Sequence, residues 1–481
     1  MTLLIKNIQL IDGSGRPPVK ADVLVRNDKI SAIGSFPNYR ADEIIDGFGA
    51  YLSPGFINID ADSDHYLTIF SNPSQQNFLE QGITTIIGGQ GGASLAPLLY
   101  GSLESIQDWA DTRKVNVNWH TMKEFLEVMM RRPLGVNFGT LVGYTTIRQA
   151  LIGESTRNLS HNELAILNSV LEKSLEQGAF GISTGLDYIY NRETSYNEIK
   201  SAAEIAAKNK KIYATRLRDE KKRLVVSINE KINVAKETGV KILINHFRPL
   251  IGYGKDYDEA LELIDKNSDR ADIYFDICPS ETSSVMIYDF LPAWAQSADR
   301  KTMLKDIQTP GLKEKILREM PRLKGDEVII VSAPNHEYLA GKSLKNFSEN
   351  RNLSISEGLL ALMKVTNFRA TLSYKNVASR KVVKTLSHDK AIIASPMVFR
   401  VLELAERKKA LPLELAIYKM TAFPASRLGL KSRGLIRDGY FADLVIFKDA
   451  EIREVILNGK RVVKDGKFQN ILAGKVLKHQ T

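Results

Sequence analysis

Hydrophobic and polar residues alternate at both ends of the chain, whereas the middle carries short, unbroken hydrophobic runs. The alternation is seen in "LLIKNIQLID" and "DVLVRNDKISAIG" near the start and in "ADLVIFKDAEIREVILNGKRVVKDGK" near the end. A period of two is typical of antiparallel strands that bury one face, and turn signals such as Asn458-Gly459 separate the segments. The two ends are therefore predicted to form one small β domain, from residues 1–53 and 427–481.

The middle of the chain, residues 54–426, alternates short apolar strands with helical patterns. Residues 223–239, for example, repeat apolar positions at spacings of three and four and stop at Gly239, which predicts a helix. Strands buried on both faces and separated by helices indicate a parallel (β/α)8 barrel. Residues from about 280 to 345 are predicted to be an insertion after the seventh strand. The eight strand candidates are "GFINIDAD", "GITTIIGG", "VNFGTLVGY", "AFGISTGL", "KIYATRLR", "KILINHFRP", "ADIYFDI" and "KAIIAS".

Polar side chains follow most of these strands, where barrel enzymes carry their sites. In "GFINIDADSDHY" the acids Asp60, Asp62 and Asp64 stand at alternate positions, which predicts a line of carboxylates on one face of a strand end. Simpler roles remain open, because a lone histidine after a strand is more often a structural hydrogen-bonding group. The other strand-end residues are Gln90, Tyr144, Ser183, Thr184, Tyr188, Arg216, Arg218, Asn245, His246, Arg248 and Asp276.

Composition and charge narrow the function classes. The 481 residues carry a net charge of +10, with 66 Lys and Arg against 56 Asp and Glu, but the basic residues are dispersed, so nucleic-acid binding is not expected. A single cysteine, Cys278, excludes disulfide frameworks and cysteine-rich zinc sites within the chain. Lys6 and Asn7 interrupt the first apolar stretch, and no run reaches the roughly 18 apolar residues of a membrane span. We expect a soluble, cytoplasmic protein without a membrane partner.

Motifs along essentially the whole chain resemble those of one enzyme family. They are "PGFINIDAD" (54–62), "QGITTIIGGQGGASLAP" (81–97), "GISTGLDY" (181–188), "YATRLRDE" (213–220), "INHFR" (244–248), "FLPAWA" (290–295), "SAPNHEYLAGKSL" (332–344), "KMTAFPASRLGL" (419–430) and "RGLIRDGYFADLVIF" (433–447). The chain resembles the N-acyl-D-amino-acid deacylases, or D-aminoacylases, of the amidohydrolase superfamily. The resemblance implies an α/β fold: a zinc-bearing (β/α)8 TIM barrel, a small β-sandwich domain from both termini, and an insertion that can cover the site.

The resemblance also implies a set of catalytic groups, and most of them are replaced here. The family holds Zn²⁺ with Cys and His ligands, and an Asp after the eighth strand takes a proton from water. Of the matched ligands only His246 remains, and Tyr188 is also retained. The replacements are Asp60 and Asp62 for the first-strand histidines, Gly91 for the cysteine, Tyr144 and Arg216 for two further histidines, Arg248 for a lysine, Asp276 for a tyrosine and Pro396 for the catalytic Asp.

These replacements suggest that one change compensates for another: acidic residues replace metal ligands, and an arginine supplies the positive charge that the metal would have carried. A guanidinium cannot ligate a metal and is always charged. Two buried carboxylates without a cation between them would be costly. We therefore expect Arg216 to occupy the space of the metal and to pair with Asp60, Asp62 or both.

On this interpretation the protein has lost zinc-dependent deacylation and is a pseudoenzyme with a binding, regulatory or assembly role. No cofactor is then expected. A small carboxylate-bearing molecule is the expected ligand, and a second copy of the chain or an active paralogue are further candidate partners. The residues expected to line the binding site are Tyr188, Arg248, Ser183 and Arg218, with Arg216 beside them.

Two alternatives stay open. In the first, the chain is an active hydrolase of linear amide C–N bonds that releases a D-amino acid, with one Zn²⁺, Mn²⁺ or Mg²⁺ on Asp60, Asp62 and His246. Asp276 or His65 would then act as the general base, and Arg216 would stabilise the oxyanion. In the second, the Asp–Arg–His cluster catalyses a different reaction without a metal.

Overall fold

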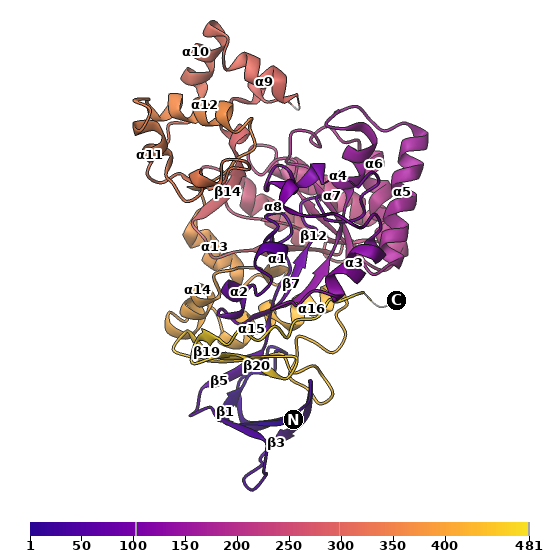
Figure 1. Ribbon diagram of the computed structural model, residues 1–481, viewed down its shortest axis with the longest axis vertical. Helices are drawn as coiled ribbons and strands as arrows, with labels where there is room; N and C mark the ends of the chain where they lie inside the picture. The colour runs from indigo at the N-terminus through magenta and orange to yellow at the C-terminus, as the bar shows by residue number, and fades with distance from the viewer. Residues whose placement is uncertain (102, 298, 480–481) are drawn as a thin grey trace.

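The computed structural model describes residues 1–101, 103–297 and 299–479. Figure 1 shows a sheet built from both termini at one end of the molecule, parallel strands surrounded by helices in the middle, and the inserted helices α9 (Arg300–Asp306) and α10 (Pro310–Glu319) at the other end. None of the helices among these residues is both long and apolar enough to cross a bilayer.

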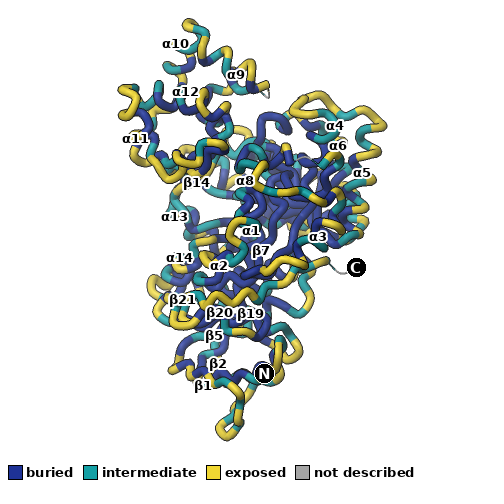
Figure 2. The backbone as a smooth tube through the Cα atoms, viewed as in Figure 1, coloured by how far each residue is buried: buried dark blue, intermediate teal, exposed yellow. Residues whose placement is uncertain are grey.

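All eight predicted strands of the middle region are present, and neighbouring strands pair in parallel. The third is divided at Leu141, so that the strands form a sheet of three and a sheet of six. In Figure 2 these strands form the main concentration of buried backbone, which explains their unbroken apolar runs. The first sheet contains β6 (Phe56–Asn58), β7 (Ile83–Gly88) and β8 (Asn137–Thr140), and the second β9 (Val142–Gly143), β10 (Gly181–Gly185), β11 (Ile212–Arg216), β12 (Lys241–Ile244), β13 (Ile273–Ile277) and β17 (Ala391–Ile393).

Helices connect these strands, as the alternating pattern predicts. The helix expected over 223–239 is confirmed as α7 (Leu224–Thr238), and Gly239 ends it with a left-handed φ of 69°. The other connecting helices include α3 (Met122–Met130), α4 (Tyr144–Ile152), α5 (His161–Glu176), α6 (Tyr196–Lys208), α8 (Gly254–Lys266), α13 (Ser379–Leu386), α15 (Leu413–Met420) and α16 (Ala422–Leu428).

The two ends of the chain meet in one nine-stranded sheet, as predicted from their shared alternation. The junction is β5 against β18, in which Leu52 lies opposite Ile446. A separate apolar core that includes Leu3, Val23 and Leu444 lies against this sheet. The two-layered sandwich stays a prediction. The strands are β1 (Thr2–Leu10), β2 (Val19–Arg26), β3 (Lys29–Gly34), β4 (Glu43–Asp46), β5 (Tyr51–Pro54), β18 (Leu444–Lys448), β19 (Glu451–Leu457), β20 (Lys460–Lys464) and β21 (Lys467–Phe468).

A separate segment follows the seventh parallel strand, β13. It contains a three-stranded antiparallel sheet of β14 (Thr282–Met286), β16 (Thr371–Lys375) and β15 (Ile329–Ser332). Because β16 belongs to this sheet, the segment extends beyond residue 345, where the insertion was predicted to end. Its helices after α10 are α11 (Leu344–Glu349) and α12 (Ile355–Val365). A buried ion pair of 2.6 Å between Arg300 Nη2 and Asp108 Oδ1 joins the segment to the loop after β7.

Candidate functional site

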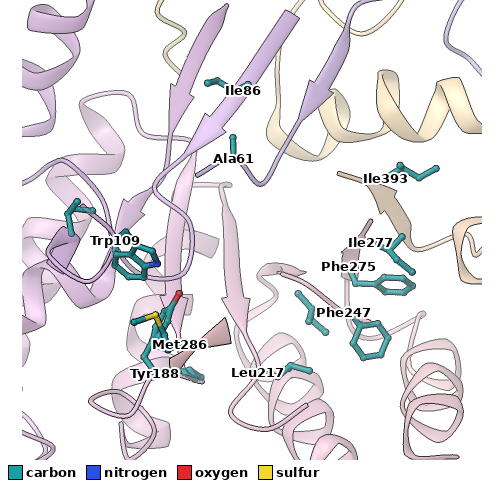
Figure 3. Close-up of a cluster of buried hydrophobic side chains, with 14 of the residues drawn as sticks. Ala61, Ile86, Trp109, Tyr188, Leu217, Phe247, Phe275, Ile277, Met286 and Ile393 are labelled. Carbon is teal, nitrogen blue, oxygen red and sulfur yellow. The ribbon is translucent and has the colours of Figure 1, made fainter. Parts of the chain in front are cut away.

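A cavity of about 1460 Å³ lies at the carboxyl ends of the parallel strands. Asp60, Arg216 and His246 line it from the strand ends, and Met286 and Asp289 line it from the inserted segment. Figure 3 shows Trp109, Tyr188 and Met286 gathered at this place. The parallel register therefore brings together most of the strand-end residues that the sequence singled out.

The three acids after the first strand do not form one line. β6 ends at Asn58, and residues 59–66 form bends and turns, so the alternation expected of a strand does not apply. Asp62 Oδ1 lies 3.3 Å from His65 Nδ1. The buried Asp64 accepts the backbone N–H of Gly89. Asp60 lies close to His246 and Asp276, at the ends of the sixth and seventh strands.

Asp60 meets His246 and Asp276, whose ligand atoms all lie within 4.8 Å of one another. The Nε2 atom of His246 is 3.3 Å from Oδ2 of Asp60. Asp276 is held in place, because its oxygens accept the His246 backbone N–H at 2.9 Å and the Asn245 side-chain amide at 3.0 Å. The Asp60 side chain is only 3% exposed, and neither of its oxygens has a hydrogen-bond partner among the described residues.

Burial is the main cause of the pKa shifts of Asp60, Asp276 and His246. It raises the pKa of Asp60 well above its ordinary value, and the negative charges of Asp276 and Asp62 add to the effect. Burial also raises the pKa of Asp276 to about 6. The pKa of His246 falls well below its ordinary value because of burial and the nearby charge of Arg216. By contrast, His65 lowers the pKa of Asp62 to about 2 against the cost of desolvation.

The expected pairing of Arg216 with Asp60 or Asp62 is wrong. Its Nη1 atom instead pairs with Oδ2 of Asp187 at 3.1 Å, and its guanidinium carbon lies 5.3 Å from the centre of the Tyr188 ring. The reason is register: Arg216 at the end of β11 lies opposite Gly185 of β10, so it meets the residues that follow β10. Among the described residues, no ion pair joins Arg216 to Asp60 or Asp62.

Arg216 nevertheless remains inside the cavity, with 17% of its side chain exposed. A Cβ atom built on Gly91 would lie 3.5 Å from its Nε atom and 3.4 Å from the Tyr188 hydroxyl. The space that a longer side chain at position 91 would enter is therefore bordered by a guanidinium.

Two of the expected binding residues have structural partners. The Ser183 hydroxyl donates to the Gly89 carbonyl and accepts the Gly92 N–H at 3.0 Å. The Arg218 guanidinium donates to Glu230 at 2.9 Å and to two backbone carbonyls at 2.6 Å. Ser183 does not line the cavity, whereas Arg218 lies on the cavity wall with its guanidinium already engaged by these partners.

The other two expected binding residues, Arg248 and Tyr188, face the cavity. Arg248 Nη2 lies 3.3 Å from Glu220, and its buried Nε atom has no hydrogen-bond partner among the described residues.

The end of β17 carries no acid. Ala394, Pro396 and Met397 line the cavity there, and the Ser395 hydroxyl is occupied by Cys278 at 3.2 Å and by the backbone N–H of Met397 at 2.8 Å. Pro396 stands where the resemblance places the catalytic Asp, so this wall offers no side chain that could take a proton from water.

The sequence did not single out several residues that shape the cavity. Asp187 was visible within "GISTGLDY", next to Tyr188, but carried no signal of its own. Trp109, whose ring centre lies 4.7 Å from that of His65 and 5.5 Å from that of Tyr188, belongs to a loop without a motif. Asp289 comes from the inserted segment.

The buried carboxyl group of Asp289 predicts that the stability of the protein depends on pH. Burial, reinforced by Asp187 and Glu220, raises its pKa to about 7, although Arg192 at 3.8 Å opposes the shift. Because the folded state then binds the proton more tightly than the unfolded state, Asp289 should weaken folding progressively as the pH rises from about 4 to about 7. The Asp289→Asn variant should be more stable than the wild type at pH 8 by about 1 kcal/mol, and equally stable at pH 4.

Thermal melting between pH 4 and pH 8 measures this effect. Asp326→Asn, an exposed acid of the same inserted segment, serves as the control and should change neither end of the profile. Equal melting temperatures for Asp289→Asn and wild type at pH 8 would show that the Asp289 carboxylate carries no such penalty.

The residues present do not fit the zinc site that the resemblance implies. That site needs thiolate and imidazole ligands, whereas Gly91 has no side chain and Arg216 carries a permanent positive charge. Asp60, His246 and Asp276 do fit one ion with mixed oxygen and nitrogen ligands, because their donor atoms converge and no hydrogen bond from the described residues engages the Asp60 oxygens.

Comparisons with known proteins extend over the whole chain. A D-aminoacylase of Alcaligenes xylosoxydans is 29% identical over 510 residues, which cover 99% of this chain and 97% of that protein. An N-acyl-D-aspartate deacylase of the same organism is 28% identical and covers 94% of this chain and 86% of its own length. No family model matches.

Solved structures give the same result for the fold. A D-aminoacylase with a binuclear metal centre superposes with a TM-score of 0.81 at 25% identity, over 99% of both chains. An N-acyl-D-glutamate deacylase of Bordetella bronchiseptica, complexed with zinc and a phosphonate inhibitor, gives a TM-score of 0.82 at 22% identity, again over 99% of both chains. The chain belongs to the D-aminoacylase, or N-acyl-D-amino-acid deacylase, family of the amidohydrolase superfamily.

Proposed function

We propose that this family member does not carry out zinc-dependent deacylation and that its cavity binds a small carboxylate-bearing molecule. The observation that carries the proposal is the place of Arg216, inside the cavity and next to the space above Gly91. A fixed guanidinium there removes one ligand position and repels a metal ion from the space beside it.

The wall formed by β17 supports the same conclusion. Deacylation needs a group that takes a proton from the attacking water, within hydrogen-bond reach of it. Pro396 stands at the corresponding position, and the neighbouring hydroxyl of Ser395 already has partners. Loss of the base and loss of the ligands are independent changes, and each alone would impair the family's reaction.

Binding of a carboxylate is favoured by the donors that remain. The buried Nε atom of Arg248 has no partner among the described residues, and Arg216 uses only its Nη1 atom in its pair with Asp187. The Tyr188 hydroxyl and Arg216 Nε both border the space above Gly91. Charge-assisted hydrogen bonds from guanidinium groups are strong, and the N-acyl-D-amino acids named for the relatives each carry a carboxylate.

Isothermal titration calorimetry with N-acetyl-D-glutamate and N-acetyl-D-methionine tests this proposal. The wild type should bind at least one of them without releasing a free amino acid. Arg248→Gln should weaken binding by about tenfold or more, since a hydrogen bond to a charged group contributes about 1.5–3 kcal/mol. Arg437→Gln, an exposed arginine outside the cavity, should bind like the wild type.

Two results would contradict the proposal. Equal affinities for the wild type and Arg248→Gln would show that Arg248 does not bind the carboxylate. Steady release of a D-amino acid during the titration would favour the active hydrolase instead.

We also infer that the two parallel sheets close into the (β/α)8 barrel of residues 54–426. Consecutive parallel pairing from β6 to β8 and from β9 to β17, and the contacts that α15 makes with both β6 and β17, support closure.

A further inference from the structure

The wall of the cavity carries more acidic than basic side chains, although the chain as a whole is basic. Nine aspartates and glutamates line the cavity against six arginines and lysines, whereas the whole chain has a net charge of +10. A binding surface favours partners of complementary charge. A ligand that offered only a carboxylate would leave this excess of acids unmatched, which indicates that the ligand also carries a positive group.

Asp60 and Asp276 form a buried acidic pair on this wall. The Asp60 side chain is 3% exposed, and no hydrogen bond from the described residues engages either of its oxygens, although His246 Nε2 lies 3.3 Å from Oδ2. Asp276 accepts neutral donors, the His246 backbone N–H and the Asn245 amide. Among the residues that the structure describes, no lysine or arginine forms an ion pair with either acid. Buried acids in this state favour a cationic hydrogen-bond donor.

Gln90 adds a neutral acceptor beside this pair. Its Nε2 atom donates to the carbonyl of Ile59, the residue before Asp60, at 2.5 Å. Gln90 lines the cavity and is 2% exposed, and its Oε1 atom has no hydrogen-bond partner among the described residues. Because buried polar atoms in proteins are nearly always hydrogen-bonded, this oxygen independently indicates a donor supplied by a ligand.

The three side chains match the donors of a primary ammonium group. Such a group has one positive charge and three N–H donors, as in a lysine side chain. The carboxylate oxygens of Asp60 and Asp276 lie within 4.8 Å of each other. One ammonium nitrogen reaches two oxygens about 4.5 Å apart when its hydrogen bonds are about 2.8 Å long. Gln90 Oε1 offers an acceptor for the remaining N–H.

We propose that the cavity binds a small carboxylate that also carries a free primary ammonium group, and that Asp60, Asp276 and Gln90 bind this ammonium group. As in the proposed function, on which this inference rests, Arg248 and Arg216 bind the carboxylate. The ligand class includes free D-amino acids and N-acyl amino acids with an amino group in the side chain.

The two binding regions adjoin each other. His246 precedes Arg248 by two residues, and its Nε2 atom lies 3.3 Å from Asp60. One small molecule can therefore reach both the guanidinium groups and the acidic pair. The ammonium group supplies the positive charge that the acidic pair lacks, so binding requires no metal ion.

Isothermal titration calorimetry of the full-length protein in the presence of a chelator tests this with two matched pairs of compounds. The first pair is D-methionine and N-acetyl-D-methionine, and the second is Nα-acetyl-D-lysine and Nα,Nε-diacetyl-D-lysine. Within each pair the carboxylate is the same and acetylation removes one ammonium group, and the pairs differ in the distance from that group to the carboxylate. In at least one pair the wild type should bind the ammonium compound about tenfold more tightly or better, a difference of about 1.4 kcal/mol.

Two variants assign this preference to the acidic pair. Asp60→Asn keeps the side-chain shape and removes the charge, so it should weaken binding of the ammonium compound by about tenfold. It should bind the acetylated compound within about threefold of the wild type, which shows that the rest of the site is intact. Glu193→Gln is the control, because Glu193 is an exposed acid of the same cavity lining, and it should keep the full preference.

Two results would overturn the inference while leaving the proposed function in place. In the first, the acetylated compound binds as tightly as the ammonium compound, or more tightly, in both pairs. In the second, the preference survives unchanged in Asp60→Asn. Absence of binding for all four compounds would overturn the proposed function together with this inference.

Discussion

Replacing Arg216 with alanine should lower the free energy of unfolding by about 2–3 kcal/mol. The change leaves Asp187 without its 3.1 Å partner and removes the positive charge that stabilises the acids of the cavity. The effect should be smaller than for a fully buried pair, because 17% of Arg216 and 28% of Asp187 are exposed. Urea unfolding, followed by circular dichroism, measures the change.

Arg223→Ala is the matched control. Arg223 is an exposed arginine that also lines the cavity, and no ion pair is found for it among the described residues. Its removal should change stability by less than about 0.5 kcal/mol. If the two variants unfold at the same urea concentration, Arg216 is not a structural counter-charge.

Arg433→Ala should have a still larger effect, about 3–5 kcal/mol. Arg433 is 4% exposed and pairs with Asp443, which is 7% exposed, and it also donates to Asn458 at 2.9 Å. Asp443 in turn accepts the Asn137 side-chain amide at 3.1 Å, so the network joins the sheet of the two termini to strand β8. Removing the arginine leaves a buried carboxylate unpaired at this junction.

Arg437→Ala, four residues away and exposed, should remain close to the wild type in the same unfolding experiment. Asp443→Asn separates the effect of charge from that of side-chain shape. The asparagine has the same shape as the aspartate, so this variant should lower the free energy of unfolding by less than Arg433→Ala does. A shift in the midpoint for Arg433→Ala no larger than that of Arg437→Ala would contradict the role of this network.

The strands were predictable because burial on both faces leaves a local signal. Runs such as "ITTIIG" are apolar whatever their neighbours, and all eight such runs proved to be parallel strands. The same logic placed His246 and Asp276 at neighbouring strand ends, since parallel strands end at one edge of a sheet.

The partners of the charged residues were not predictable, because they depend on register and on loops. Asp187 lies beyond the end of β10, and no pattern shows that Arg216 reaches it. Asp62 was assigned to the face of Asp60 on the assumption that the strand continues, whereas β6 ends at Asn58. Because β6 ends earlier than predicted, Asp276 and not Asp62 joins Asp60 and His246 as the third candidate ligand.

The most direct test of the central claim is a turnover measurement. N-acetyl-D-methionine, N-acetyl-D-aspartate and N-acetyl-D-glutamate are incubated with the purified protein, with and without added Zn²⁺ or Mn²⁺, and the free D-amino acid is quantified. We predict no release above a protein-free blank under any of these conditions. Release that requires the metal, disappears with a chelator and is lost in Asp276→Asn would show that the chain is an active amide hydrolase.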